Sequence, residues 1–222
     1  DDYAHAESMR KNFCTTEEEI ADIRKGRMLI IVDSPSRENE ADFYIPADAA
    51  NHSAITTMIR EGGGIICTAI TEDPAKRLAL PLMVARGENT EKTGVNFTVS
   101  MNARRGITTG VSAHDRAKTI QVLAEARSGA KDIVKPGHVF GLIARPGGLL
   151  EREGHTEAAV DLARLANRAP AGVLCEIVGR DGRMAKAKEI LRLSRRLGIK
   201  IVAISDLIRY LRAHPLPTAR SS

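Results

Sequence analysis

The stretch Met28-Leu-Ile-Ile-Val-Asp-Ser-Pro-Ser-Arg-Glu-Asn-Glu-Ala-Asp-Phe-Tyr-Ile-Pro46 decides the fold of this chain. Its first part, residues 28–33, is short, apolar and rich in β-branched side chains, which predicts a buried strand. Residues 43–46 predict a second short strand. A parallel pair needs a crossover of a dozen or more residues, usually a helix. The link over 34–42 is too short for that, so the central sheet need not be all parallel.

The remaining sequence alternates between strand-like and helix-like segments. Further strands are expected over 64–70, 95–101, 138–144, 173–178 and 199–204. Helices are expected over 15–25, 47–61, 157–167, 184–197 and 206–214, and after Thr71 and Ser112. Thr156 is expected to be the N-cap of the helix over 157–167. No linker or repeat divides the chain, so a single domain of α/β type around a central sheet is predicted.

Composition excludes several classes of protein. The 222 residues are 43% apolar and 27% charged, which is ordinary for a globular chain that buries its own core. The three cysteines are widely spaced and form no CxxC, so neither a disulfide framework nor a structural zinc site is expected. No apolar run is long enough to span a bilayer, and the first residues contain no signal-peptide core. We therefore expect a cytoplasmic protein without a membrane partner.

The basic charge of the chain is local. Lys and Arg number 33 against 28 Asp and Glu, but residues 180–222 alone hold 11 basic and 3 acidic side chains. There are four Phe, three Tyr and no Trp, so aromatic platforms for base stacking are scarce. We therefore expect no nucleic-acid partner, although a basic nucleic-acid-binding module built on the C-terminal part is kept as an alternative.

The segment 37–42, Arg-Glu-Asn-Glu-Ala-Asp, holds the first candidate site. In an extended segment Glu38, Glu40 and Asp42 share one face, with Asp33 just upstream. Carboxylates so close together usually require a cation, a raised pKa or full solvation. Their oxygens suit a hard ion such as Mg²⁺ or Mn²⁺. A solvated charged loop is the equally weighted alternative.

The segment 152–157, Arg-Glu-Gly-His-Thr-Glu, holds the second candidate site, directly before a predicted helix. The free N–H groups and the dipole of a helix N-terminus bind phosphate. Arg152 adds a guanidinium fork for an oxyanion, and His155 is suited to ligate a metal or to donate to an oxyanion. An ordinary capped helix with a surface histidine remains the alternative.

Four further features are less specific. His138 follows Pro136-Gly137 at a strand start, where a lone histidine is usually structural. Glu176 lies inside an apolar run and therefore needs a partner or a proton. Cys67 is interpreted first as a small buried hydrophobic residue. The hydroxyl-bearing loop over 108–112 is suited to hydrogen-bond a polyol.

Taken in order, these segments resemble the 3,4-dihydroxy-2-butanone 4-phosphate synthase family of riboflavin biosynthesis, over about residues 20–213. The resemblance rests on eight segments: Arg-Glu-Asn-Glu-Ala-Asp at 37–42, Gly-Gly-Gly-Ile-Ile-Cys at 62–67, Leu-Pro-Leu-Met at 80–83, Phe-Thr-Val-Ser at 97–100, Thr-Thr-Gly-Val-Ser-Ala-His-Asp-Arg at 108–116, Pro-Gly-His-Val-Phe at 136–140, Arg-Glu-Gly-His-Thr-Glu-Ala at 152–158 and Leu-Cys-Glu-Ile at 174–177. It implies an α+β fold, a three-layer α-β-α domain around a mixed, twisted sheet. It also implies a homodimer that converts D-ribulose 5-phosphate to L-3,4-dihydroxy-2-butanone 4-phosphate and formate with Mg²⁺, or Mn²⁺ as a substitute.

The resemblance also assigns roles to residues of this chain. Glu38 and His155 would bind the metal. His138 and Glu176 would be the essential acid–base groups. Asp33, Glu40, Cys67 and Thr109 would complete the pocket. The remaining substrate-binding residues would be Arg37, Asp42, Arg152, Glu153, Gly154 and Thr156, together with Glu38, His155, Thr109 and Glu176 already named.

Two departures from the family pattern and a division into three segments accompany the resemblance. The chain has Asp33-Ser34-Pro35-Ser36 where the family usually has an acidic run, and Ala41 where it usually has glycine, which puts loop flexibility in question. We expect a synthase domain over 20–214, a partly disordered segment over 1–19, and a disordered tail over 215–222. The match ends where the single-function form of the family ends, so no cyclohydrolase half is expected. A metal-dependent sugar-phosphate isomerase or aldolase, and an inactive relative that acts as a scaffold, remain alternatives.

Overall fold

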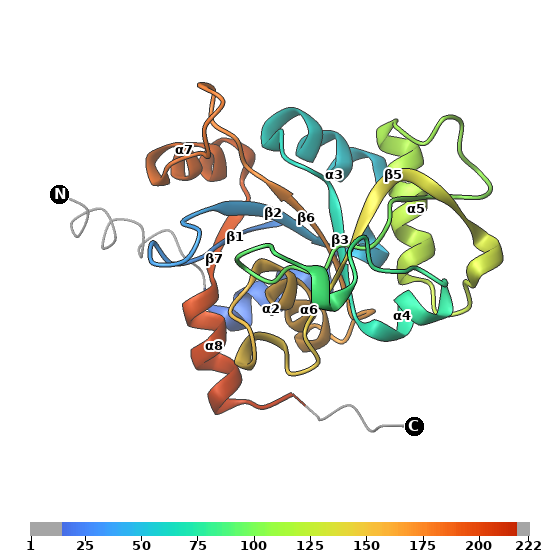
Figure 1. Ribbon diagram of the computed structural model, residues 1–222. Coiled ribbons are helices and arrows are strands. Elements are labelled where there is room, and N and C mark those ends of the chain that lie inside the picture. The colour runs from blue at the N-terminus through green and yellow to red at the C-terminus, as the bar shows by residue number, and fades with distance from the viewer. Residues whose placement is uncertain (1–14, 217–222) are drawn as a thin grey trace.

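A seven-stranded sheet runs through the middle of the molecule with helices on both faces (Figure 1). The computed structural model describes residues 15–216. The strands lie in the order β4-β5-β3-β6-β2-β1-β7. Their bounds are β1 Leu29–Val32, β2 Ala41–Pro46, β3 Cys67–Ile70, β4 Met101–Ala103, β5 Ile133–Ile143, β6 Ala171–Glu176 and β7 Lys200–Ala203.

The sheet is mixed, and the short link between β1 and β2 is one reason. β1 and β2 pair antiparallel, with Leu29 opposite Tyr44 and Val32 opposite Ala41. β1 also pairs parallel with β7, and β3 pairs parallel with β5. The pairs β2–β6, β3–β6 and β4–β5 are antiparallel. The expectation of a sheet that is not all parallel is therefore confirmed.

Helices cover the two faces of the sheet and form the outer layers. Their bounds are α2 Thr16–Arg24, α3 His52–Thr57, α4 Glu72–Arg77, α5 Ala113–Ala124, α6 His155–Leu165, α7 Ala187–Leu197 and α8 Ile204–Ala213. One buried cluster joins the sheet to α3, α5 and α7, and a second joins it to α2, α6 and α8. In Figure 1 the helices α3, α5 and α7 lie on the upper side of the sheet, and α2, α6 and α8 lie on the lower side. The predicted three-layer α-β-α arrangement is confirmed.

The alternation of side chains along β2 shows how one strand serves both cores. Phe43 and Ile45 point into the cluster with α3 and α5, whereas Tyr44 points into the cluster with α6. All three side chains are buried. A strand that is covered on both faces must be apolar on both, which explains the near-continuous apolar run.

Two helix starts follow the predicted capping signals. The Thr15 hydroxyl accepts from the N–H of Glu18, and the Glu18 carboxylate accepts from the N–H of Thr15, which is a complete capping box. At α5, the Ser112 hydroxyl accepts from the N–H of Asp115. These side chains satisfy backbone donors that have no partner inside the helix.

Three local predictions are wrong in detail. The helix expected over 47–61 is broken into a 3₁₀ turn at Ala47–Ala49, α3, and a π-helical turn at Met58–Gly62, because Asn51 accepts from the N–H of Ala54 and starts a new helix. The strand expected over 95–101 forms only isolated bridges, at Phe97 and Thr98, and β4 begins at Met101. The N-cap of α6 is Gly154, so Thr156 lies inside the first turn.

Part of the predicted domain organisation lies outside the described residues. Residues 1–14, with Cys14, and 217–222 are outside, so the disorder expected over 1–19 and 215–222 is untested there. Within the described part, residues 15–19 form the cap and first turn of α2. No helix in residues 15–216 combines the length and the apolar character that crossing a membrane requires.

Candidate active site

A cavity of about 250 Å³ lies where β2 begins, β6 ends and α6 begins. Residues from five separate segments line it, since loops 37–40 and 91–97 and strand β5 also contribute. The lining residues are Arg37, Glu38, Glu40, Asp42, Glu91, Thr93, Val95, Phe97, Leu142, Arg152, His155, Thr156, Leu174 and Glu176. Eight of the residues predicted from the sequence are among them.

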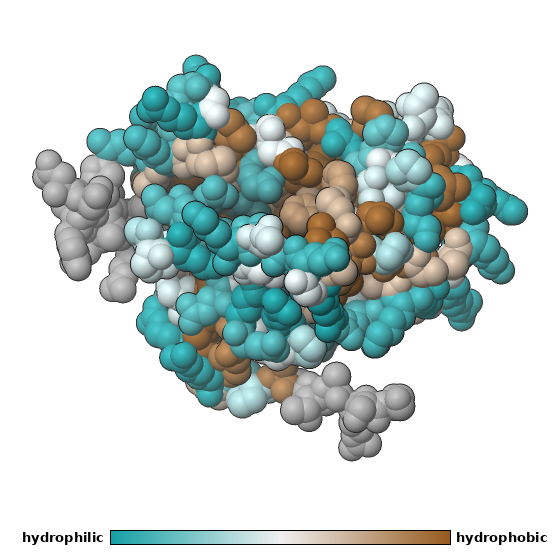
Figure 2. All heavy atoms as spheres, in the orientation of Figure 1, coloured by the Kyte–Doolittle hydropathy of each residue, from teal (hydrophilic) through white to brown (hydrophobic). Residues whose placement is uncertain are grey.

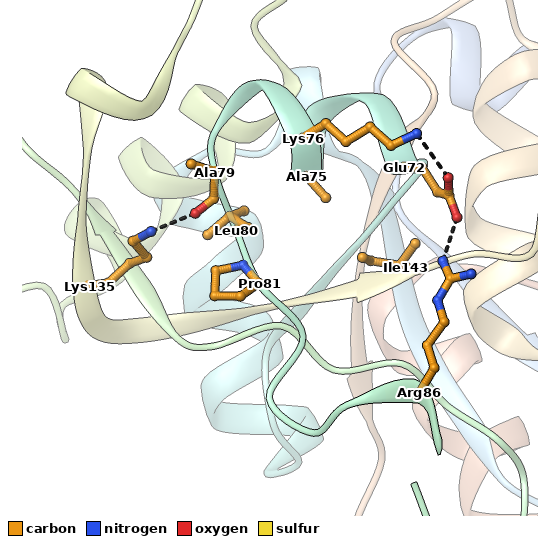
Figure 3. Close-up of a pocket in the computed structure, with 9 residues that line it drawn as sticks. All are labelled: Glu72, Ala75, Lys76, Ala79, Leu80, Pro81, Arg86, Lys135 and Ile143. Carbon is orange, nitrogen blue, oxygen red and sulfur yellow. Dashed lines mark hydrogen bonds and ion pairs between the residues drawn. The ribbon is translucent and has the colours of Figure 1, made fainter. Parts of the chain in front are cut away.

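A second cavity is larger, about 500 Å³, but carries little chemistry (Figure 3). Glu72 lies in it between Lys76, 3.2 Å away, and Arg86, 2.6 Å away. Lys135 Nζ donates to the carbonyl oxygen of Ala79 at 2.5 Å. Each of its charged groups thus already has a partner within the chain, and the other lining residues are aliphatic. The smaller cavity is the candidate site because it gathers carboxylates, an imidazole and guanidinium groups in one place.

Asp33 builds the loop that carries the acidic side chains. Its Oδ1 accepts from the N–H of Glu40 at 2.9 Å, and its Oδ2 accepts from the N–H of Glu38 at 3.0 Å and from Arg37 Nη1 at 3.1 Å. Asp33 therefore stabilises the loop over 37–40 through these hydrogen bonds and does not itself line the cavity. Glu38, Glu40 and Asp42 all line it, as the alternation of side chains predicts.

The Ala41 that departs from the family pattern sits in ordinary extended backbone. It is the first residue of β2, is buried, and pairs with Val32. The left-handed position of this loop belongs to Asn39, with a φ of 55°. Asparagine tolerates that region better than most residues. The conformation of the loop therefore needs no glycine at position 41.

His155 and two carboxylates form the group best suited to a metal ion. Asp33, Glu38 and His155 each offer one ligand atom, and these atoms lie within 4.8 Å of one another. His155 Nδ1 is 3.6 Å from Glu38 Oε2, and the buried Nε2 has no hydrogen-bond partner among the described residues. Carboxylate oxygens with one imidazole are a fitting donor set for a divalent cation.

The pKa values of this group reflect its burial and its crowded charges. Burial lowers the pKa of His155, but the carboxylates of Asp42, Glu38 and Asp33 outweigh burial and raise it to about 9. The neighbouring His155 in turn lowers the pKa of Glu38. Burial raises the pKa of Asp42 to about 7, and burial with the charge of Glu38 raises the pKa of Glu40. A divalent cation would replace the proton on His155, because a ligating imidazole must be neutral.

Glu176 ends β6 directly beside Asp42. The two residues are opposite each other in the antiparallel pair of β2 and β6. Glu176 Oε2 accepts from the N–H of Ile65 at 2.8 Å. Gly64 permits this close approach, since a Cβ there would lie 2.6 Å from the carbonyl oxygen of Glu176. A carboxylate of the cavity wall is thereby held by the backbone of the segment that precedes β3.

The start of α6 and two arginines supply positive potential. Gly154 caps α6 without a side-chain hydrogen bond, so the N–H groups of the first turn are not occupied by a cap. His155 and Thr156 in that turn line the cavity. Arg37 lies 2.5 Å from Glu38, and Arg152 lies 2.6 Å from the buried Glu157. A phosphate group would find donors at this end of the cavity.

Several predicted residues lie outside the cavity wall. Cys67 is buried in β3, and burial raises the pKa of its thiol well above the usual value. Glu153 is exposed beside the cap residue Gly154. His138 and Thr109 are also exposed, and Asn102 contacts both His138 and Gly110, the residue after Thr109. Asn102 accepts from the N–H of His138 at 2.9 Å, and Gly110 packs on its amide.

Sequence reasoning missed the wall formed by residues 91–97 and the anchor Glu157. Glu91, Thr93 and Val95 lie in no matching segment, and Phe97 was noted only as the first residue of the segment 97–100 and as part of the alternation over 95–101. Glu157 was read as the beginning of a helix. Its side chain is instead 1% exposed and accepts from Arg145 N and Arg152 Nη1. The available signal was the position of Glu157 within the matching segment 152–158.

Fold and site together define an α-β-α protein with an acidic, histidine-containing cavity beside a helix N-terminus. The family model of 3,4-dihydroxy-2-butanone 4-phosphate synthase matches residues 17–210. The chain is 48% identical over 216 residues to the probable bifunctional riboflavin biosynthesis protein RIBA 2, chloroplastic, of Oryza sativa subsp. japonica, covering 97% of this chain and 39% of that protein. It is 47% identical over 200 residues to 3,4-dihydroxy-2-butanone 4-phosphate synthase of Pseudomonas aeruginosa, covering 90% of this chain and 54% of that protein.

Solved structures agree with the sequence comparisons. A crystal structure of 3,4-dihydroxy-2-butanone 4-phosphate synthase in complex with two magnesium ions matches with a TM-score of 0.86 at 37% identity, over 91% of this chain and 98% of that one. The chain belongs to the 3,4-dihydroxy-2-butanone 4-phosphate synthase family. It spans 39% and 54% of the length of the two curated relatives described above.

Proposed function

We propose that the protein converts D-ribulose 5-phosphate to L-3,4-dihydroxy-2-butanone 4-phosphate and formate, with Mg²⁺, and so supplies the four-carbon unit for riboflavin biosynthesis. The carrying observation is the cavity that joins Glu38 and His155 to the N-terminus of α6. Family membership supports the substrate class, and the cavity offers donors for both ends of a small sugar phosphate.

The phosphate would bind at the α6 end of the cavity. The first-turn N–H groups, the Thr156 hydroxyl and the Arg152 guanidinium are the available donors. The hydroxyl groups of the sugar would then extend toward Arg37 and Asp42. In this orientation the reacting carbons lie beside the carboxylates, and only the phosphate lies beside Arg152.

Glu38 and His155 would hold Mg²⁺, with Asp33 as the third candidate donor. The ion, when bound, supplies Lewis acidity that stabilises negative charge on substrate oxygens. The related structure described above contains two magnesium ions, which supports the choice of metal. Mn²⁺ as a substitute stays a prediction.

The side chains of this chain would move the protons. The substrate and the two products together have the same atoms, so a water eliminated on the way must be consumed again before formate leaves. Enolisation of the ketose needs a base, and elimination needs an acid. Glu176, held by the N–H of Ile65 beside Asp42, is placed for such exchange. His138 is the second acid–base group that the resemblance implies.

A homodimer is part of the proposal, with the second copy covering the surface around His138. Two exposed apolar side chains flank that histidine. Val111, 50% exposed, follows Gly110, which packs on Asn102. Ile65, 54% exposed, comes opposite His138 when the register of β3 and β5 is continued by two residues. Figure 2 shows hydrophobic side chains gathered on the middle and right of one face. Exposed apolar surface of this kind favours an interface.

A formate assay tests the proposal. Purified protein with ribulose 5-phosphate and Mg²⁺ is expected to release one formate for each substrate consumed, and chelation is expected to stop the release. An isomerase or aldolase would consume the substrate without formate. Absence of formate at high protein concentration would therefore refute the proposed reaction. The expected cytoplasmic location stays a prediction.

A further inference from the structure

The cavity wall over 91–95 is tied to Arg152 through one threonine. Arg152 Nε donates to the carbonyl oxygen of Thr93 at 2.9 Å, and Arg152 Nη2 donates to the Thr93 hydroxyl at 3.2 Å. On its other side, Nη1 donates to Glu157 at 2.6 Å. The Arg152 side chain is only 15% exposed. Its guanidinium is thus held from two directions by groups of this chain.

Two of the N–H groups of the Arg152 guanidinium remain without a partner in these contacts. A guanidinium has five N–H groups, and the three bonds above use the one on Nε and one on each terminal nitrogen. Thr93 therefore occupies the edge formed by Nε and Nη2. One N–H remains on Nη1 and one on Nη2, and these two donors are available to an oxyanion.

Glu91 orients the Thr93 hydroxyl for this task. Thr93 Oγ1 donates its only proton to Glu91 Oε2 at 2.6 Å, so its lone pairs are left to accept from Arg152. The same carboxylate oxygen accepts from the N–H of Thr93 at 2.7 Å and of Val95 at 3.3 Å. The result is a directed chain of hydrogen bonds from Arg152 to Thr93 to Glu91.

Two further contacts hold the same loop against the start of α6. Arg145 Nη2 donates to the carbonyl oxygen of Gly94 at 3.2 Å. The N–H of Arg145 donates to the second oxygen of Glu157 at 2.9 Å. Glu157 therefore anchors both arginines that contact residues 93–94. The loop, the two arginines and α6 form one connected polar network beside the cavity.

We propose that Thr93 is a positioning residue that aims Arg152 at the phosphate of the substrate. The inference rests on the proposed function, which puts the phosphate at the α6 end. Without the hydroxyl, Nη2 loses its partner, and the guanidinium is held only by the Thr93 carbonyl oxygen and Glu157, which hold it less firmly in place. The reacting carbons would lie at the Glu38 end, so the loss is expected in binding rather than in the chemical step.

The test compares three threonine variants by two measurements. Thr93→Val removes the hydroxyl and keeps the shape, whereas Thr93→Ser keeps the hydroxyl. Thr90→Val is the matched control, because Thr90 is exposed and its hydroxyl makes no hydrogen bond within residues 15–216. The measurements are steady-state formate release and the Kd of inorganic phosphate by calorimetry.

For Thr93→Val we expect KM and the phosphate Kd to rise about tenfold, the effect of one lost hydrogen bond to a charged group, with kcat within about twofold. Thr93→Ser and Thr90→Val should match the parent. Glu91→Ala, which removes the acceptor of the hydroxyl proton, should raise the phosphate Kd about threefold. This variant tests the network even if Thr93→Val does not fold.

The two proposals fail in different ways. A parent protein that binds phosphate but releases no formate refutes the reaction, and the phosphate Kd of the variants still tests Thr93. A parent that releases formate while Thr93→Val keeps the parental KM and Kd refutes the role of Thr93 alone. Thr93→Ser behaving like Thr93→Val, an unchanged Kd in Glu91→Ala, or no phosphate binding by the parent would also overturn it.

Discussion

The Glu38 carboxylate faces two cationic groups through a single oxygen. Oε2 is 2.5 Å from Arg37 Nη1 and 3.6 Å from His155 Nδ1. Glu38→Gln keeps the shape of this side chain and removes its charge. We expect Mg²⁺ affinity to fall by more than tenfold and formate release by more than a hundredfold. Calorimetric titration with Mg²⁺ and the formate assay check both, and near-normal turnover would remove Glu38 from the metal site.

His138 offers a second test at the residue scale. Its ring is exposed and contacts Asn102 rather than the cavity, so it should contribute little to substrate affinity. We expect His138→Ala to lower kcat at least a hundredfold while the Kd of ribulose 5-phosphate changes less than threefold. A role for His138 in catalysis requires that the variant still binds ribulose 5-phosphate but no longer turns it over. A normal rate would show that His138 has no part in the reaction.

Side-chain identity predicted some of the site and missed the rest for a physical reason. The alternation of an extended segment suffices to bring Glu38, Glu40 and Asp42 into one cavity. Thr93 carries no such signal, because its role depends on Arg152, which reaches it only after the chain has folded. Contacts of this kind depend on tertiary neighbours, which local patterns do not specify.

At the scale of elements, the sequence predicts two helix caps correctly but does not predict the helix break within residues 47–61. Thr15–Glu18 and Ser112–Asp115 satisfy N–H groups within one turn, so they act wherever the sequence puts them. Within 47–61 the apolar spacing continues across Ala50 and Asn51, although the chain bends there. The amide of Gln121 donates to the carbonyl oxygen of Ala50. A distant helix therefore helps to stabilise the bend.

β6 passes under α6 so closely that one position admits only glycine. A Cβ at Gly172 would lie 2.5 Å from Tyr44 Cε2 and 3.0 Å from the carbonyl oxygen of Ala159. We expect Gly172→Ala to lower the free energy of unfolding by about 1–3 kcal/mol through overpacking. Urea denaturation measures this. Gly87→Ala is the control, because nothing lies within 4 Å of a Cβ there. Equal stability of the two variants would contradict the packing argument.

Asp22 joins α2 to β7 and gives that contact a pH dependence. Its Oδ2 is 3.0 Å from Lys200 Nζ, and its Oδ1 is 3.0 Å from Arg27 Nη1. Burial raises the pKa of Asp22, but Lys200 and Arg27 together outweigh burial and lower it below 3.8. The stabilisation is therefore present above about pH 4 and is lost as the pH falls through the lowered pKa.

Asp22→Asn tests that dependence. At pH 7 the variant should lose about 1 kcal/mol of unfolding free energy, a modest value because the Arg27 and Lys200 side chains are 62% and 40% exposed and water screens both ion pairs. The difference from the parent should shrink steadily below about pH 4. Urea denaturation at several pH values measures it, with Glu88→Gln as the control, since the Glu88 side chain makes no hydrogen bond or ion pair among the described residues. A difference independent of pH would contradict the ion-pair explanation.

At the scale of the whole molecule, the sheet order brings distant segments of the sequence together. β2 lies beside β6, which lies beside β3, so residues 42, 176 and 65 become neighbours. The short link between β1 and β2 predicted that the sheet is mixed, but strand order depends on long-range pairing. The family resemblance, rather than periodicity, supplied the expectation that these segments share one site.

His138 lies on β5 but does not line the cavity, and the surface around it is where we propose that the second copy binds. Val111→Glu puts a charge on that surface without disturbing a buried side chain, because Val111 is 50% exposed. We expect the parent to sediment with twice the mass of one chain, and the variant to sediment as a monomer with formate release lowered at least tenfold. Leu150→Glu is the control. Leu150 is 55% exposed but lies on the turn that packs against α6 and α8. If Leu150→Glu dissociates the dimer and Val111→Glu does not, the two copies meet through the α6–α8 layer, and His138 faces solvent in the assembly.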